Sequence, residues 1–278
     1  EGRIVPEAGY EIDLLPGRGL QRRLTWANAE AVTGAVRAFG AARRIVRRHR
    51  PAIVVGFGGY ASLPCVAAAR SAGVPVIVHE QDAAPGLANR LGVRLGARPA
   101  VSIPGTLLPG ATLTGNPVRA EVAAAGRAPD ADPALVLVFG GSQGARSVNR
   151  AAVAAYDGWR DRDDLRVRHV CGPRYLEDCR AALDALRREG DRLVYELVAY
   201  EEHMEEQYRR CALVVCRSGA GTVAELSAVG VPSVLVPLPG APSDHQMRNA
   251  RALEQAGAAV VLPDPECDGP RLTEIVDE

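Results

Sequence analysis

Short runs of apolar residues alternate with segments of helical periodicity along almost the whole chain. The runs are continuously hydrophobic rather than alternating, which is typical of strands buried on both faces of a parallel sheet. Predicted strands cover residues 52–55, 74–78, 111–113, 134–138, 167–170, 193–197, 212–215, 233–236 and 258–262. Predicted helices cover residues 27–48, 63–71, 86–95, 145–155, 174–189, 222–229 and 244–255. Strands that are each followed by a helix predict an α/β protein with doubly wound parallel sheets.

A chain of 278 residues is long enough for two domains of ordinary size. Residues 123–133, rich in Ala, Pro and Asp, are the natural linker, which places one domain at 1–122 and the other at 134–278. Ligands of such sheets bind at the carboxyl ends of the strands. We therefore expect a binding site in a cleft between the two domains.

The most informative segment joins the predicted strand 212–215 to the helix that follows it, and reads CRSGAGTVAE at 216–225. Its small side chains let phosphates approach the backbone, where the N–H groups and positive dipole of a helix start would hold them. Glu225 lies on the first turns of that helix, where its carboxylate could accept hydrogen bonds from ribose hydroxyls. A second strand-to-helix turn reads FGGSQG at 139–144. Two such turns in one domain indicate a diphosphate ligand.

Either turn alone is equally compatible with a structural role, because α/β chains reverse tightly between strand and helix. Neither is a G-x-G-x-x-G dinucleotide fingerprint or a G-x-x-x-x-G-K-[ST] P-loop. The chain has no lysine, which excludes any P-loop that depends on one. A dinucleotide oxidoreductase is therefore the weakest of the alternatives.

Composition and charge narrow the class of protein. The chain is 47% hydrophobic, has no apolar run near the ~20 residues that span a bilayer, and does not open like a signal peptide. Its six cysteines form no C-x-x-C pair, which favours reduced core thiols in a cytoplasmic protein. Residues 1–128 carry 16 Arg against 8 acidic residues, and residues 129–278 carry 17 against 25. The basic first half predicts an anionic partner, and with only 4% aromatics a membrane surface fits better than nucleic acid.

Further motifs follow the predicted strands. They are GFGGY at 56–60, HEQD at 79–82, GNPVR at 115–119, and Asp244, His245, Gln246 and Asn249 in the helix after 233–236. His79 and Glu80 are candidate acid–base groups, although a histidine held by a neighbouring carbonyl would look the same. The Asp-x-Asp pairs at 130–132 and 161–163 are read as solvated charge. No cluster has metal-ligand spacing, so no metal site is predicted.

Together these motifs resemble the MurG family, the undecaprenyl-diphospho-muramoylpentapeptide β-N-acetylglucosaminyltransferases of bacterial cell-wall synthesis. The match runs in the family's order through GFGGY, HEQD, GNPVR, GGSQG, CRSGAGTVAE and the DHQ…N helix, from near residue 3 to about residue 262. The resemblance implies a GT-B fold, in which two Rossmann-like domains face a cleft. It also implies an inverting, metal-independent transfer of N-acetylglucosamine from UDP-N-acetylglucosamine to the 4-hydroxyl of N-acetylmuramic acid in lipid I, giving lipid II without a cofactor.

The resemblance assigns roles to single residues. Ser142 contacts the diphosphate, Arg119 reaches the nucleotide, Glu225 binds the ribose, and Gln246 binds hydroxyls of the sugar. Backbone near Tyr200 and Glu201 borders the uracil. The implied substrate-binding set is Asp82, Arg119, Ser142, Glu201, Ala220, Gly221, Thr222, Val223, Ala224, Glu225 and Gln246. A lipid-linked acceptor implies a peripheral enzyme at the cytoplasmic face of the membrane, and the basic and apolar residues of 18–26 are the candidate contact.

The chain departs from the family in two places. Asp82 stands where the family commonly has Asn, so a carboxylate replaces a neutral amide. The family's opening strand, glycine-rich loop and helix, with its proposed catalytic His, are expected upstream of residue 1, and the chain's end is expected to be short. His79 and Glu80 are then the weak local candidates for the base, and we expect donor binding with little transfer. Another GT-B enzyme with a different acceptor, or a UDP-sugar-binding module without turnover, are the alternatives.

Overall fold

The computed structural model describes residues 2, 4–16, 27–130, 132–141 and 143–278, with side chains from residue 34 onward in the first long helix. The chain forms two units. The first comprises Glu1–Gln81 and Pro85–Thr114, and the second comprises Asp82–Ala84 and Gly115–Glu278. Within the described ranges, none of the helices has the length and apolar character to span a bilayer.

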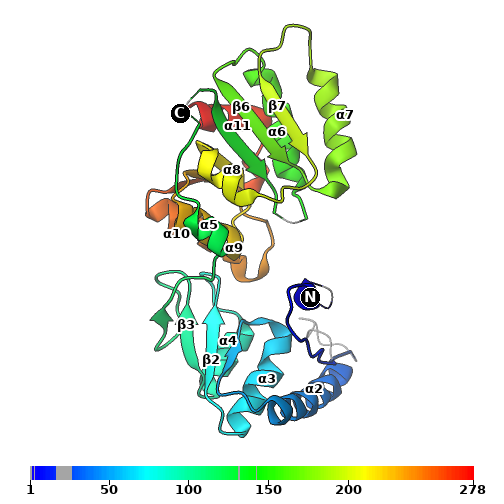
Figure 1. Ribbon diagram of the computed structural model, residues 1–278, viewed down its shortest axis with the longest axis vertical. Coiled ribbons are helices and arrows are strands. Elements are labelled where there is room, and N and C mark those ends of the chain that lie inside the picture. The colour runs from blue at the N-terminus through cyan, green and yellow to red at the C-terminus, as the bar shows by residue number, and fades with distance from the viewer. Residues whose placement is uncertain (1, 3, 17–26, 131, 142) are drawn as a thin grey trace. The chain divides into compact units, whose positions relative to one another are not determined.

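The first unit is a parallel four-stranded sheet with helices packed on it. The strands, in the spatial order β1-β2-β3-β4, are β1 (Val54–Gly56), β2 (Val76–Glu80), β3 (Arg98–Val101) and β4 (Thr112–Leu113). The helices are α1 (Ile4–Glu7), α2 (Ala27–His49), α3 (Gly59–Ser71) and α4 (Leu87–Arg94). In Figure 1, α4, α3 and α2 follow one another outward from β2. The core lies between Val76 and Val78 of the sheet and Val66 and Ala42 of the helices.

The second unit is a parallel six-stranded sheet in the order β10-β9-β8-β5-β6-β7. Its strands are β5 (Ala134–Phe139), β6 (Leu165–Val170), β7 (Val194–Val198), β8 (Leu213–Cys216), β9 (Ser233–Leu235) and β10 (Ala259–Val261). Its α-helices are α5 (Ala120–Ala124), α6 (Arg146–Trp159), α7 (Leu176–Leu186), α8 (Met204–Arg210), α9 (Ala220–Val229), α10 (His245–Gln255) and α11 (Gly269–Asp277).

Alternate residues of β5 face two separate hydrophobic cores. Val136 and Val138 pack with α6, α7 and α11, where Trp159 is fully buried. Leu135, Leu137 and Phe139 pack on the other face with α5, α8, α9 and α10, which gather together in Figure 1. A sheet covered on both faces accounts for the continuous hydrophobicity of its strands.

The predicted fold class is confirmed, since both units are parallel α/β layers that contain all the expected strands. Sequence reasoning missed β3, because Arg98 and Pro99 interrupt the apolar run and leave only Ala100 and Val101 buried. It also missed the short helices α5 and α8, and α11 at the end of the chain. Short helices carry too few turns for a clear period.

The observed division of the chain also differs from the predicted one. The stretch predicted as a linker, 123–133, falls within the second unit, whose main segment begins at Gly115. Val122 of α5 is fully buried in the second unit's core. The Asp130 carboxylate pairs with Arg210 at 2.7 Å, and the Ala128 N–H donates to the Arg209 carbonyl at 2.9 Å. At these positions the segment rich in Ala, Pro and Asp is packed against the second unit and is not a free linker.

Candidate functional site

The turn between β5 and α6 brings backbone N–H groups to the carboxyl end of the sheet. Gly141 and Gly144 have φ values of +83° and +71°, which only glycine adopts without strain. A Cβ on Gly140 would collide with the backbone of Gly144 and Ala145, so the turn closes too tightly for any side chain. The first turn of α6 has neither a side-chain cap nor an acidic residue. Its N–H groups and positive dipole end are therefore left for an anion.

The turn between β8 and α9 has the same character. Gly219 is the N-cap residue of α9, no side chain caps the helix, and its first turn contains no acidic residue. Ser218, the natural capping residue nearby, is fully buried and instead donates its hydroxyl to the Gln246 carbonyl at 2.8 Å. The start of α9 is thus a second uncapped N-terminus.

Both helix starts open on one pocket of the second unit, with a volume of about 630 Å³. Gly140 and Gly144 line it from the first turn, and Gly219 and Thr222 line it from the second. Arginines 146 and 150 of α6 also line this pocket. Two uncapped helix starts together with arginine side chains make a site suited to a ligand with two adjacent phosphates.

Glu225 lies on α9 with its carboxylate already oriented by two neighbours. The Tyr208 hydroxyl donates to Oε2 at 2.9 Å, and Arg119 Nη2 lies 3.3 Å from Oε1. Burial raises the pKa of Tyr208 far above its usual range, so this hydroxyl remains a donor. The Glu225 side chain keeps 21% exposure. The structure therefore brings together two of the predicted nucleotide contacts, Arg119 and Glu225.

Gln246, in the first turn of α10, lines the same pocket. Its Oε1 accepts a hydrogen bond from the Leu238 N–H at 2.9 Å, and its backbone carbonyl receives the Ser218 hydroxyl. These bonds fix the side chain and leave its Nε2 amide as the donor for a ligand hydroxyl. Among the described residues of the predicted substrate-binding set, Thr222 and Gln246 line this pocket.

Glu201 follows β7 and is held by the protein itself. Arg168 contacts its Oε2 at 2.7 and 2.8 Å, and the His203 N–H donates to Oε1 at 3.1 Å. The Glu201 side chain is only 8% exposed. We therefore expect any contact with the uracil ring to come from the backbone near Tyr200 and Glu201. The Glu201 carboxylate is already engaged within the protein.

His79 and Glu80 of the HEQD motif lie at the end of β2 in the first unit. Glu80 is 5% exposed, and its Oε2 accepts hydrogen bonds from the Gly86 N–H at 2.8 Å and from Asn89 Nδ2 at 2.9 Å. Asn89 Nδ2 also lies 3.1 Å from the His79 carbonyl. The His79 ring packs on Phe57 with ring centroids 5.3 Å apart. Glu80 therefore anchors the loop that leads into α4, which makes it a poor candidate for a free base.

Asp82 belongs to the second unit, where its charge finds partners. Asn249 Nδ2 donates to Asp82 Oδ1 at 2.8 Å, and His245 Nδ1 lies 3.7 Å from Oδ2. Asn249 is fully buried, and its amide also contacts the Ser218 carbonyl and the Ala83 N–H. This arrangement accommodates a carboxylate where the family commonly has an amide.

Two predictions fall on residues that the structure does not describe: the diphosphate contact of Ser142 and the membrane contact of 18–26. Sequence reasoning assigned no role to Ser147 and Asp264, or to Arg217, although this arginine stands inside the CRSGAG motif; all three line the pocket. An arginine beside a turn that is predicted to bind phosphate was the signal. Among the described residues, no group of three or more His, Cys, Asp and Glu is placed to hold a metal.

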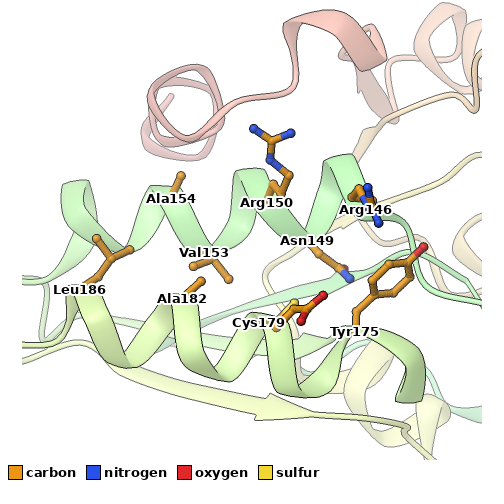
Figure 2. A pocket seen from close by; sticks show the side chains of 10 residues that line it. Arg146, Asn149, Arg150, Val153, Ala154, Tyr175, Cys179, Ala182 and Leu186 are labelled. Atoms are coloured by element: carbon orange, nitrogen blue, oxygen red, sulfur yellow. The ribbon is translucent and has the colours of Figure 1, made fainter.

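A groove of about 640 Å³ runs between α6 and α7 beside this pocket. Figure 2 shows Val153 and Ala182 between the two helices, with Leu186 towards one end and Tyr175 at the other. Tyr175, like the two arginines of α6, lines both the groove and the pocket. The pocket is thus bordered by an apolar channel on the side of α7.

Comparison with known proteins decides the family. Residues 1–100 match the glycosyltransferase family 28 N-terminal domain, and residues 135–278 match the family 28 C-terminal domain. A UDP-N-acetylglucosamine--N-acetylmuramyl-(pentapeptide) pyrophosphoryl-undecaprenol N-acetylglucosamine transferase of Shewanella halifaxensis is 39% identical over 98% of this chain and 75% of its own length. A protein of the same description from Acidothermus cellulolyticus is 40% identical over 99% of this chain and 77% of its own length. The chain belongs to the MurG family of glycosyltransferases.

The solved structures agree with this membership of the MurG family. The crystal structure of MurG from Acinetobacter baumannii superposes with a TM-score of 0.79 at 29% identity, covering 99% of this chain and 77% of that one. A glycosyltransferase of kitacinnamycin, at 18% identity and a TM-score of 0.66, shares the fold and covers 99% of this chain and 80% of that one. The resemblance inferred from six short motifs is confirmed, and so are the GT-B fold class and the glycosyltransferase class of enzyme.

Proposed function

We propose that the protein transfers N-acetylglucosamine from UDP-N-acetylglucosamine to N-acetylmuramyl-(pentapeptide) pyrophosphoryl-undecaprenol, the lipid I of peptidoglycan synthesis, and so makes lipid II. The observation that carries this proposal is the pocket of the second unit, where two uncapped helix starts meet. The names of the full-length relatives supply the identity of the sugar and of the acceptor.

In the proposed orientation of the donor, its diphosphate occupies this pocket and its nucleoside extends towards Glu225. The diphosphate takes the N–H groups at the starts of α6 and α9, and the ribose hydroxyls bond to Glu225. A sugar hydroxyl accepts a hydrogen bond from Nε2 of Gln246, while the backbone at Tyr200 and Glu201 borders the uracil. In this orientation the anionic part of the donor meets both helix dipoles, and the carboxylate meets only neutral hydroxyls.

The proposed chemistry is an inverting, metal-independent displacement. The 4-hydroxyl of the acceptor attacks C1 of the sugar, the bond from C1 to the diphosphate oxygen breaks, and UDP leaves. The helix starts and Arg146 stabilise the charge that develops on the diphosphate. A base takes the hydroxyl proton. Because Glu80 is engaged by Gly86 and Asn89, His79 is the first of the two local candidates to test.

The same proposal places the enzyme on the cytoplasmic face of the membrane, as a peripheral protein on an anionic surface. The undecaprenyl chain in the relatives' acceptor supports this placement. The first unit also exposes apolar side chains, among them Phe57 (51%), Tyr60 (62%) and Leu107 (83%). We expect binding to anionic but not neutral vesicles that falls as salt rises, and that weakens in the double variant Arg22→Glu, Arg23→Glu. Equal sedimentation with both vesicle types, or none, would contradict the placement.

Transfer of labelled sugar is the direct test. The protein is incubated with UDP-N-acetylglucosamine or UDP-glucose, with and without lipid I, and both free UDP and labelled lipid are measured. Labelled lipid only with the N-acetylated donor and lipid I supports the proposal. Labelling of a different acceptor would indicate another GT-B activity. Donor binding in calorimetry without turnover would indicate a UDP-sugar-binding module.

Calorimetry with UDP tests the ribose contact separately. Glu225→Ala removes the proposed acceptor of one or two ribose hydrogen bonds, each worth about 1.5–3 kcal/mol for a charged group. We expect UDP affinity to fall by at least tenfold. Glu177→Ala, an exposed glutamate on α7, is the control and should change nothing. Unchanged affinity in Glu225→Ala would remove the ribose assignment.

A further inference from the structure

Arg217 stands two residues before the N-cap of α9, and it lines the pocket. Its Nη1 lies 2.5 Å from Asp264 Oδ1 and 3.1 Å from each of the carbonyl oxygens of Val236 and Pro237. Its Nη2 donates to Ser147 Oγ at 2.8 Å. The Arg217 side chain is only 12% exposed, and both of its terminal nitrogens bond to groups of this chain.

Those partners come from three different places at the carboxyl edge of the sheet. Ser147 lies in the first turn of α6, and its hydroxyl in turn donates to Asp264 Oδ1 at 2.5 Å. Val236 and Pro237 follow β9, and Asp264 follows β10. Arg217, Ser147 and Asp264 therefore close a three-membered ring of hydrogen bonds, here named the Arg217 ring.

The Arg217 ring joins the two helix starts that open on the pocket. Arg217 enters α9 through Ser218 and Gly219, while Ser147 is already part of α6. A ligand with two linked phosphates needs both N-termini at one spacing, because its own length is fixed. Groups that bind by orientation lose much of their effect when they are displaced by about 1 Å.

We propose that the Arg217 ring positions the starts of α6 and α9 for the diphosphate of the donor. This inference rests on the proposed function, because it takes a nucleoside diphosphate as the ligand. Arg217 acts through the two helix starts and does not touch the phosphates. The planar guanidinium is suited to this role, since it holds a carboxylate, a hydroxyl and two carbonyls in fixed directions.

Ligands of different length distinguish positioning from a general contribution to folding. UDP, UMP and uridine are titrated into the wild type, Arg217→Lys and Ser147→Ala. Lysine keeps the charge but offers a single donor group, and alanine removes only the hydroxyl. We expect UDP affinity to fall about tenfold or more in Arg217→Lys and about threefold in Ser147→Ala. Uridine affinity should stay within about twofold in both, with UMP between.

Asp264→Ala gives a test of opposite sign. Asp264 lines the pocket, so removing its charge should strengthen binding of an anion if nearby charge were all that mattered. It would also release Arg217 to reach a phosphate directly. The Arg217 ring predicts the reverse, because without Asp264 the two helix starts lose their common anchor. We expect Asp264→Ala to bind UDP more weakly than the wild type does.

Arg210→Lys is the matched control, because Arg210 also pairs with an aspartate of the second unit, Asp130, at 2.7 Å but does not line the pocket. It should leave the ratio of UDP to uridine affinity unchanged. Equal losses of UDP and uridine in the ring variants, no loss at all, or tighter UDP binding in Asp264→Ala would each overturn the proposal. If Arg217→Lys fails to fold, Ser147→Ala and Asp264→Ala decide. A wild type that does not bind UDP would instead overturn the proposed function.

Discussion

The loop after β2 and the turns before α6 and α9 occupy the same place in their sheets, yet they use their polar groups in opposite ways. In the first unit, the Glu80 carboxylate accepts from the Gly86 N–H and from Asn89, so the motif satisfies itself. In the second unit, the starts of α6 and α9 have no side-chain caps. We call a motif closed when its polar groups bond to one another, and such a motif stabilises the fold. We call a turn open when its backbone N–H groups have no side-chain cap, and such a turn can bind a ligand.

This contrast predicts that substitutions in the two kinds of motif affect different quantities, namely protein stability and donor affinity. A substitution in a closed motif should change the free energy of unfolding and leave donor affinity alone. A substitution in an open turn should change donor affinity, because the missing partner is the ligand. Four measurements test the contrast.

The largest effect is expected for Gly140→Ala. Its Cβ would collide with the backbone of Gly144 and Ala145, so the turn must open and move the start of α6. Overpacking of this kind costs roughly 1–3 kcal/mol and more when backbone is involved. We expect loss of measurable UDP binding in calorimetry.

Gly40→Ala in α2 is the control for that substitution, because nothing lies within 4 Å of the added Cβ. Alanine there should stabilise the helix by about 0.5–1 kcal/mol and leave UDP affinity unchanged. A Gly140→Ala protein that binds UDP as the wild type does would contradict the assignment of this turn to the diphosphate.

A pH effect is expected from a closed network in the second unit. His169 is fully buried between Tyr195, whose hydroxyl lies 2.9 Å from Nδ1, and Asn149, whose Oδ1 lies 3.1 Å from Nε2. Burial lowers the pKa of His169 to about 4. In the unfolded chain the pKa of this histidine is near 6.5. Between about pH 6.5 and 4, the unfolded chain therefore binds a proton at His169 and the folded chain does not. This contribution is complete above about pH 6.5 and is lost as pH falls towards 4.

We expect the wild type to lose about 2–3 kcal/mol of unfolding free energy from this group between pH 7.5 and 4.5. Urea unfolding of the wild type and of His169→Gln at several pH values measures it. The variant should be less stable at pH 7.5 but show a smaller decline. Parallel curves for the two proteins would show that His169 does not carry the effect.

Sequence alone predicted most of this fold because most of its strands lie in continuous apolar runs that are rich in valine. Strand β5 is an example, with five of its six residues buried. The failures have physical causes: β3 contains Arg98 and Pro99, and α5 is five residues long. The boundary at Gly115 could not be predicted, because it depends on where Val122 and Asp130 pack.

For the candidate site, the sequence indicated the local motifs but not the contacts between residues that are distant in sequence. The glycine turns and Glu225 could be proposed as ligand contacts because a small turn followed by a helix is a local sequence pattern. The Arg217 ring was missed because Ser147, Arg217 and Asp264 lie far apart in sequence and meet only through the strand order of the sheet. The anchoring role of Glu80 was hidden for a similar reason, since HEQD does not show that Gly86 and Asn89 fold back onto it.

A moderate effect, confined to stability, is expected for Glu80→Gln. The amide keeps an acceptor for Asn89 or the Gly86 N–H but loses the charge, and such bonds to charged groups contribute about 1.5–3 kcal/mol. We expect about 1–2 kcal/mol less stability in urea unfolding, with UDP affinity within twofold of wild type. Glu11→Gln, at an exposed position, is the control. A large loss of UDP affinity with unchanged stability would invert the contrast between closed and open motifs.

The smallest effect is expected for Tyr208→Phe. Tyr208 takes part in an internal hydrogen bond and also orients a proposed ligand contact. The Tyr208 hydroxyl orients Glu225, whose carboxylate is also the proposed ribose contact. Phenylalanine keeps the ring and its edge-to-face contact with Phe139, where the centroids are 6.2 Å apart. Losing one hydrogen bond of about 1 kcal/mol should weaken UDP binding about fivefold.

A double-mutant cycle shows whether that weakening passes through Glu225. In a Glu225→Ala background the tyrosine hydroxyl has no carboxylate to orient, so Tyr208→Phe should then leave UDP affinity unchanged. The same loss of coupling is expected in the wild-type background with 2′,3′-dideoxy-UDP, which offers no ribose hydroxyls. Weakening of equal size in both backgrounds and with both ligands would mean that Tyr208 contributes by packing alone. Glu225 would then be positioned by Arg119 and the geometry of α9.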